Sequence, residues 1–170
     1  HLDKNERLKG LEHIDALYES ILNKKVLNIK YKSFKARESK NYVVHPQLLK
    51  EFNNRWFLIC LFKGNIMNLA LDRIEEIATE EKTEYIDKDF NADRYFGEVI
   101  GATVSETQRP QNVVFHITSQ HSPYVKTKPF HHSQEIVKED ETGTTFKICV
   151  QLNFELERMI LGMGECITIL

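Results

Sequence analysis

The sequence has little of several features that would place it in a special class of protein. With only 7 Gly, 4 Pro and 3 Cys in 170 residues, it is neither collagen-like, nor low in complexity, nor disulfide-rich. No run approaches the roughly 20 apolar residues of a membrane-spanning helix, and no signal peptide opens the chain, so we expect no membrane partner. The first residue is His1 rather than Met, which suggests a piece cut from a longer protein.

Signatures of catalysis are also missing. Cys60, Cys149 and Cys166 lie in apolar runs without zinc-ligand spacing, so we expect buried thiols in a reducing, cytoplasmic environment. P-loops, nucleophile elbows and G-x-G-x-x-G patterns are absent. We therefore expect neither an enzyme nor a bound cofactor. We interpret three histidines as surface residues rather than metal ligands: His121, His131 and His132.

The small net charge of −2 conceals a strong asymmetry along the chain. Between Lys24 and Arg73, 11 Lys and Arg face 3 acidic residues, which gives +8. The remainder carries 12 basic and 22 acidic residues, which gives −10. A basic segment inside an acidic chain predicts an anionic partner.

Hydrophobic periodicity predicts a helix followed by a small sheet. Apolar residues recur every three or four positions over residues 5–23, so we expect a linker helix in residues 1–23. Short runs with strand patterning follow, and Pro46 in one of them belongs at a sheet edge or a bulge. Their meander order favours a small SH3- or Sm-like β-barrel in residues 24–80. The expected strands are 26–32, 42–49, 56–62, 66–71 and 73–77.

The second half of the chain predicts a separate domain. Residues 81–110 are charged and rich in turns, and we interpret them as a connector. Residues 111–170 read as β-α-β-β-α-β, the order of a ferredoxin-like domain with two helices on one face of an antiparallel sheet. The predicted fold class is therefore α+β.

Cations and aromatic residues of the basic segment form the candidate site. Arginine presents a planar fork of donors that suits phosphate, and aromatic faces stack on nucleobases. We expect an anionic ligand such as a nucleotide or a nucleic-acid fragment, and a solvated charged face is the alternative that residue types leave open. The candidates are Tyr31, Arg37, His45, Lys50, Arg55, Trp56, Phe57 and Arg73.

Two short motifs resemble the WYL-domain family of bacterial transcriptional regulators. They are Trp56-Phe57-Leu58 and Leu71-Asp72-Arg73-Ile74. The similarity covers about residues 24–77; the preceding helix resembles the family's linker helix, and residues 111–170 resemble its ferredoxin-like C-terminal extension. The resemblance implies an effector-sensing, dimerising module whose DNA-binding helix-turn-helix would precede this sequence.

The resemblance also implies roles for the candidate residues. Family members are thought to sense nucleotide-like or nucleic-acid ligands in a basic barrel pocket. Arg55 and Arg73 would then contact the anion. His45 and Tyr31 would supply directional hydrogen bonds, and Trp56 would offer a wall or a stacking face.

The sequence departs from the family pattern at two places. Phe57 replaces the tyrosine of the triplet and so lacks its hydroxyl. Residues 67–70 read Met-Asn-Leu-Ala where an Arg-x-Phe-Arg pattern is common. Either Arg37, Lys50 and Arg55 compensate for the missing cations, or the ligand carries less charge.

The expected function is the sensing and dimerisation part of a homodimeric regulator that reaches promoter DNA through the absent domain. Binding of the effector would shift the balance between two arrangements of the protein. Two alternatives remain open. One is a constitutive RNA- or single-stranded-DNA-binding barrel, and the other is a purely structural dimerisation unit whose basic face meets the acidic half of its partner.

Overall fold

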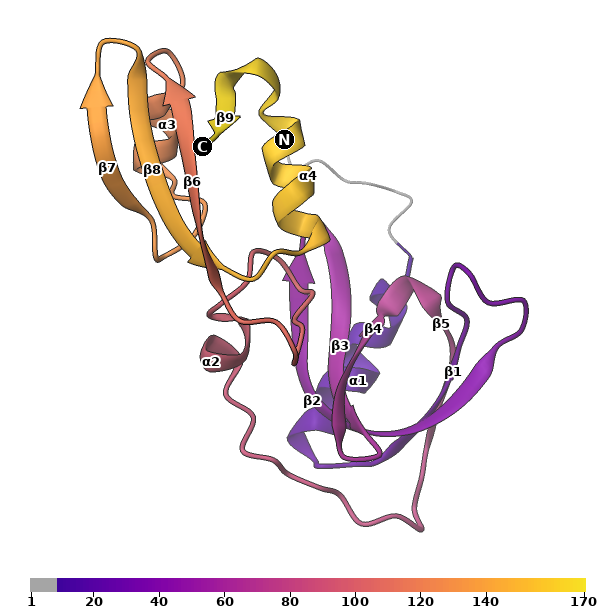
Figure 1. Cartoon of the computed structure of the whole chain (residues 1–170). Coiled ribbons are helices and arrows are strands. Elements are labelled where there is room, and N and C mark those ends of the chain that lie inside the picture. The colour runs from indigo at the N-terminus through magenta and orange to yellow at the C-terminus, as the bar shows by residue number, and fades with distance from the viewer. Residues whose placement is uncertain (1–8) are drawn as a thin grey trace. The chain divides into compact units, whose positions relative to one another are not determined.

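The computed structural model describes residues 9–170, and the start of the expected linker helix lies outside them. The chain divides into two compact units, the first ending at Phe90 and the second covering Asn91–Leu170. Each unit is an antiparallel sheet with a few short helices, so the predicted α+β class is confirmed (Figure 1). In the described part of the chain, every helix is too short or too polar to cross a bilayer.

The first unit is a five-stranded sheet in the order β4-β3-β2-β1-β5, preceded by a helix. All neighbouring strands run antiparallel. Short connections such as the turn between β3 and β4 allow this meander. Its elements are η1 (Leu11–His13), α1 (Ile14–Leu22), β1 (Leu27–Tyr31), β2 (Lys40–Phe52), β3 (Arg55–Phe62), β4 (Asn65–Ala70), η2 (Leu71–Arg73) and β5 (Ile74–Thr79).

The core of this unit lies between α1 and one face of the sheet. Leu17 of α1 is completely buried, and Ile14 and Ile21 pack beside it, as their helical spacing requires. In β3, both Leu58 and Ile59 are completely buried although they point to opposite faces. The strand is therefore interior, as its continuous apolar run predicts.

A bulge in β2 interrupts the ladder to β3. The register shifts between Pro46 and Leu48, which confirms the prediction that Pro46 belongs at an edge or a bulge. The bulge leaves Gln47 outside the regular pairing, and its side-chain amide is then available to the segment that follows β5.

The chain entering α1 is packed tightly against η2. Gly10 has a φ of 89°, a conformation that favours glycine. A Cβ atom built there would lie 2.4 Å from the Leu71 carbonyl carbon and 2.6 Å from the Asp72 nitrogen, closer than any real contact. The imidazole Nε2 of His13 also lies 3.3 Å from the Ile74 carbonyl oxygen. Residues 10–13 and 71–74 therefore form one packed layer.

The second unit places its strands in the order β7-β8-β6-β9, all antiparallel. After α2, its elements follow the predicted order β-α-β-β-α-β. They are α2 (Ala92–Phe96), β6 (Gln111–Thr118), α3 (Ser122–Thr127), β7 (Glu135–Asp140), β8 (Gly143–Val150), α4 (Phe154–Gly162), η3 (Gly164–Cys166) and β9 (Ile167–Ile169).

Both longer helices of this unit contribute to one core. Val125 of α3 and Leu156 of α4 pack with Phe115 and Phe146 of the sheet. Those aromatic rings stack with centroids 5.6 Å apart. The inward-facing residues of β6 and β8 are two positions apart, so they share one face of the sheet, as strand geometry requires.

Polar side chains at the start of α4 hold an irregular segment, residues 98–105. Asn153 donates to the carbonyl oxygens of Ile100 and Thr103 at 2.9 and 3.0 Å. Glu155 Oε1 accepts from the Thr103 hydroxyl at 2.7 Å. The two Asn153 bonds satisfy backbone carbonyl groups that no strand or helix pairs, and all three bonds tie this stretch to the second unit.

Candidate functional site

Arg55 and Asp72 form the centre of the candidate site. Arg55 opens β3, and its NH2 group donates to both carboxylate oxygens of Asp72 at 3.0 and 3.1 Å. Its Nε donates to Oδ1 at 3.3 Å. Side-on donation from a guanidinium fork to a carboxylate fixes both side chains in one orientation. The start of β3 is thereby tied to η2.

Arg73 reaches the same carboxylate from its other side. Its Nε lies 3.7 Å from Asp72 Oδ2, which is an ion pair but too long for a hydrogen bond. This Nε is buried and has no hydrogen-bond partner among the described residues. Arg73 therefore retains an unmet donor beside Asp72.

The ring of Phe34 lies close to both guanidinium groups. The guanidinium carbon of Arg73 is 3.0 Å from the centroid of the Phe34 ring, and that of Arg55 is 5.6 Å from it. Phe34 itself is 73% exposed, although it belongs to a polar loop between β1 and β2. We call Phe34, Arg55, Asp72 and Arg73 the arginine cluster. Two cations and one carboxylate leave it with a net positive charge.

A pocket of about 220 Å³ opens next to the arginine cluster. The loop after β1 forms one wall and η2 with the start of β5 forms the other. A hollow of this size suits a phosphate or a small part of a larger ligand. Its lining residues are Lys32, Ser33, Phe34, Ala36, Asp72, Arg73, Ile74 and Glu75.

Tyr31 lies within electrostatic range of the arginine cluster. Burial raises the pKa of its phenol, and the charge of Asp72 adds to the rise. A backbone hydrogen bond with Ala70 and the charges of Arg55 and Arg73 act in the opposite direction. The phenol is therefore neutral and can donate or accept near the cluster.

Lys50 and Phe57 lie on the same face of the sheet as Arg55. Lys50 pairs with Phe57 across β2 and β3, and Arg55 is two residues before Phe57. The Arg55 guanidinium carbon is 5.6 Å from the Phe57 ring centroid. Burial lowers the pKa of the Lys50 ammonium, although the charge of Glu51 opposes this. This face extends the positive surface along β3.

Trp56 points to the opposite face. It alternates with Arg55 and Phe57 along β3 and packs against the hydrophobic core that contains Leu58 and Cys60. The structure therefore does not bring Trp56 together with the arginine cluster as a stacking face. Trp56 instead lies on the core-facing side of β3.

His45 lies apart from the cluster, in a second polar group. It pairs with Leu61 near the far end of β3 and is 7% exposed. Its Nδ1 accepts from the Ile86 backbone at 3.1 Å, and its ring meets Tyr85 edge-on, with centroids 5.9 Å apart. Burial lowers the pKa of the imidazole. The Nδ1 of His45 is therefore already hydrogen-bonded within the protein.

Neighbouring side chains complete this second group. Gln47 donates to the Tyr85 hydroxyl and to the Ile86 carbonyl oxygen, both at 3.1 Å. Tyr85 donates to the Pro46 carbonyl oxygen in a short hydrogen bond. We call His45, Gln47, Tyr85 and Ile86 the histidine clasp, which fastens the segment after β5 onto the bulge of β2.

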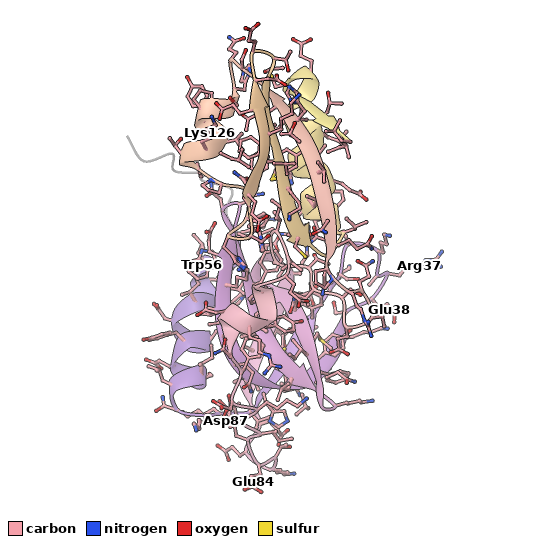
Figure 2. The ribbon with its side chains drawn as sticks, turned by 60° about the vertical axis from the view of Figure 1, so that its left-hand side comes forward. Arg37, Glu38, Trp56, Glu84, Asp87 and Lys126 are labelled. Atoms are coloured by element: carbon pink, nitrogen blue, oxygen red, sulfur yellow. The ribbon has the colours of Figure 1, made fainter. Side chains whose placement is uncertain are left out.

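Arg37 belongs to the loop between β1 and β2 and is exposed. Figure 2 shows its side chain extending away from the ribbon into solvent, and it is not part of the pocket lining. Of the candidate residues, the structure therefore unites Arg55 and Arg73, with Tyr31, Lys50 and Phe57 nearby. It separates Trp56, His45 and Arg37 from that cluster.

Sequence reasoning missed Phe34 and Asp72. A phenylalanine inside the polar stretch Ser33-Phe34-Lys35 was the available signal, because a lone aromatic residue in a charged loop has no strand or helix to pack it. In the sequence, Asp72 stands out only as a member of the Leu71-Asp72-Arg73-Ile74 motif. Nothing next to it in the sequence indicates that Arg55 is its partner.

The histidines and cysteines also differ from expectation. His131 is buried, so the prediction of a surface histidine is wrong for this residue. The prediction of buried thiols holds only for Cys60, because Cys149 is exposed and Cys166 is half-buried. Within residues 9–170, no group of three or more His, Cys, Asp or Glu is placed to hold a metal ion.

Comparisons with known proteins give one family match and two similar structures. Residues 12–79 match the family model described as the WYL domain. A CRISPR Cas-related protein of known structure has a TM-score of 0.55 at 11% identity, over 95% of this chain and 47% of that one. Proteasome accessory factor B/C (PafBC) of Arthrobacter aurescens has a TM-score of 0.42 at 17% identity, over 95% and 24%.

The chain thus spans about half of the first of these proteins and about a quarter of the second. Among curated proteins, none matches the sequence.

Proposed function

Residues 12–79 form a WYL domain, and from this premise we propose that the chain is the ligand-sensing part of a regulatory protein. The ligand is an anion that binds at the arginine cluster. The observation that carries this proposal is the convergence of Arg55 and Arg73 on Asp72 and Phe34, next to a pocket.

The arrangement suits an anion that competes with Asp72. A phosphate oxygen can accept from the unmet Nε of Arg73 and take over donors that Asp72 now occupies. Buried donors without partners carry an energetic cost, so a ligand that satisfies them gains affinity. The exposed ring of Phe34 offers a stacking surface beside the phosphate position, which favours a nucleotide or a short single strand.

The regulatory consequence is a population shift. The ligand-free state has Asp72 between the two arginines, and the bound state has the anion there. Only the difference in affinity between the states can move the equilibrium. Because Asp72 belongs to η2, replacing its contacts repositions the segment between β4 and β5.

We extend the proposal to the rest of the chain. The first sheet is an SH3- or Sm-like barrel, and the second unit is a ferredoxin-like domain that helps two copies pair. The protein is cytoplasmic and not an enzyme. Promoter DNA is contacted through a domain outside this sequence.

The test is ligand binding by wild type and matched arginine variants. Fluorescence anisotropy with a labelled short single-stranded oligothymidylate gives the affinity, and unlabelled inorganic phosphate and a nucleoside triphosphate serve as competitors. R73A should weaken binding at least tenfold, because a charge-assisted bond of about 1.5–3 kcal/mol is lost. R37A is the control and should change affinity less than about twofold, since surface ion contacts contribute little.

Each result discriminates among the functions. Equal affinity of R73A and wild type would overturn the proposal. Affinity that grows with oligonucleotide length and falls steeply with salt would favour a constitutive nucleic-acid-binding module instead. An R55A/R73A variant with altered dimer affinity and no ligand binding in wild type would indicate a structural dimerisation unit.

A further inference from the structure

The chain's cysteines occupy different chemical environments. The Cys60 thiol is completely buried, donates to the Met67 carbonyl oxygen at 3.5 Å, and burial raises its pKa to about 12. Such a thiol is inert. Cys149 is exposed on β8. Cys166 is half-buried at the end of η3, and its sulfur faces an imidazole.

Cys166 and His121 form a thiol–imidazole pair. The Cys166 sulfur lies 3.5 Å from His121 Nε2, and His121 Nδ1 lies 3.2 Å from the Thr118 hydroxyl. With its proton on Nδ1, the ring donates to Thr118 and leaves Nε2 free to accept the thiol proton. A nucleophile next to a base that a third group orients is the arrangement that activates thiols.

Sheet register holds the pair in place. Ile117 of β6 lies directly opposite Ile167 of β9, so the next residue pair outward is Thr118 and Cys166. The backbone N–H of His121 also donates to the Thr118 carbonyl oxygen at 2.9 Å, so the turn keeps His121 next to Thr118. Because strand pairing and a turn fix all three residues, the contact does not depend on a mobile loop.

We propose that Cys166 is a reactive thiol and a modification site that undergoes exchange with low-molecular-weight disulfides. His121 Nε2 takes the thiol proton and leaves a thiolate on Cys166. The thiolate attacks one sulfur of the disulfide, the new S–S bond forms as the old one breaks, and the departing thiolate receives the proton from Nε2. The products are a mixed disulfide on Cys166 and one free small thiol.

Modification of this site would act on the edge of the second sheet. The added group replaces the hydrogen bond between Cys166 and His121, one residue before β9 begins. This reaction is independent of the arginine cluster and of the ligand proposed there.

The test measures exchange at each cysteine separately. The folded 170-residue chain is incubated with oxidised glutathione, quenched with acid at intervals, and mapped by peptide mass spectrometry. Cys166 should react about tenfold faster than Cys149 although it is less exposed, because His121 Nε2, 3.5 Å from its sulfur, can take the thiol proton during the attack.

Variants identify the source of the reactivity. H121N should reduce the Cys166 rate to that of Cys149 or below, and T118V should reduce it by about threefold through loss of orientation. H116N is the control, because that ring lies on β6, the strand that also contains Thr118, but contacts Thr145, and it should leave both rates unchanged. Far-UV circular dichroism checks folding of each variant.

Two outcomes would overturn the proposal. One is a Cys166 rate no higher than that of Cys149 in wild type. The other is an unchanged Cys166 rate in folded H121N. If H121N does not fold, equal rates in T118V and H116N overturn it in the same way.

Discussion

The arginine cluster and the histidine clasp both belong to the first unit, and each includes a residue of β2 or β3. Each combines a nitrogen-rich side chain with an aromatic ring. The cluster's Phe34 is 73% exposed, and a pocket lies beside it. The clasp's His45 is 7% exposed, and the backbone of Ile86 already donates to its ring.

The difference shows what separates a candidate binding site from a structural joint. In the clasp, the protein's own backbone satisfies the polar side chains, so a ligand would have to displace a folded segment. In the cluster, a donor of Arg73 has no partner within residues 9–170, and Asp72 forms an ion pair with each of the two arginines. The partner of each nitrogen therefore distinguishes the two groups.

Replacing His45 gives the largest expected effect on stability. His45→Ala removes a buried ring and leaves the Ile86 N–H without its acceptor, so the free energy of unfolding should fall by about 2–3 kcal/mol. The affinity of His45→Ala for the ligand should stay within about twofold of the wild-type affinity, because the clasp is separate from the cluster. Urea denaturation and oligonucleotide titration measure the two quantities.

A loss of ligand binding in His45→Ala would show that the histidine clasp and the arginine cluster form one site. If His45→Ala retained its stability but lost ligand binding, His45 would be a ligand-binding residue, as the sequence alone suggested. His45→Gln is the companion variant, because its amide oxygen can still accept from a backbone N–H, and it should lose less stability than alanine.

Replacing Asp72 should reduce stability less than replacing His45 does, and it should also change binding. Asp72→Asn leaves two arginines close together without a carboxylate, and about 1 kcal/mol of stability should be lost, since the side chains of Arg55 and Asp72 are 40% and 23% exposed. Anion affinity should rise about threefold to tenfold, because the internal competitor has lost its charge.

Asp87→Asn is the matched control for this change. Asp87 forms an exposed ion pair with Lys24 at 2.7 Å, away from the pocket lining. Little change in stability and none in binding is expected. Weaker anion binding in Asp72→Asn would show that Asp72 orients the arginines for the ligand rather than competing with it.

Lowering the pH should produce the smallest effect, and it should act on the clasp. Burial lowers the pKa of His45 and, in the second unit, that of His131, where the neighbouring His132 adds to the decrease and a backbone hydrogen bond with Gly97 opposes it. A lowered pKa means that the unfolded chain binds the proton more readily. Stability is therefore fully present above about pH 6.5 and is lost as the pH falls below it.

The geometry of the clasp supports the same direction. The His45 Nδ1 accepts a hydrogen bond, so protonation there would remove the acceptor of the Ile86 N–H. Thermal unfolding between about pH 7.5 and pH 5.5 at constant ionic strength measures the effect, and His45→Gln should reduce it. An unfolding temperature that is constant over this range would contradict the expectation.

The sequence predicted the elements of the fold better than the site. The alternation around Ile29, the continuous run ending at Phe62 and the helical spacing around Leu17 follow from burial, which repeats with the period of each element. Pro46 marked the bulge because it cannot donate to the ladder. These signals are local, so a single sequence contains them.

The pairing of side chains was not local and could not be read in the same way. Arg55 and Asp72 are 17 positions apart and meet because β3 pairs with β4, which leads directly into η2. The sequence named both arginines but not the carboxylate between them. It grouped His45 with them because residue type alone does not show which nitrogen a backbone amide already contacts.

The absence of a side chain at Gly10 has a mechanical consequence. The backbone of Leu71 and Asp72 lies where a methyl group at residue 10 would be. The two backbone segments are therefore in direct contact, with no side chain of residue 10 between them. A shift of Asp72 cannot be absorbed by a rotating side chain and is transmitted directly to the entrance of α1. A rearrangement that begins at the Asp72 carboxylate therefore reaches the segment that leads into α1.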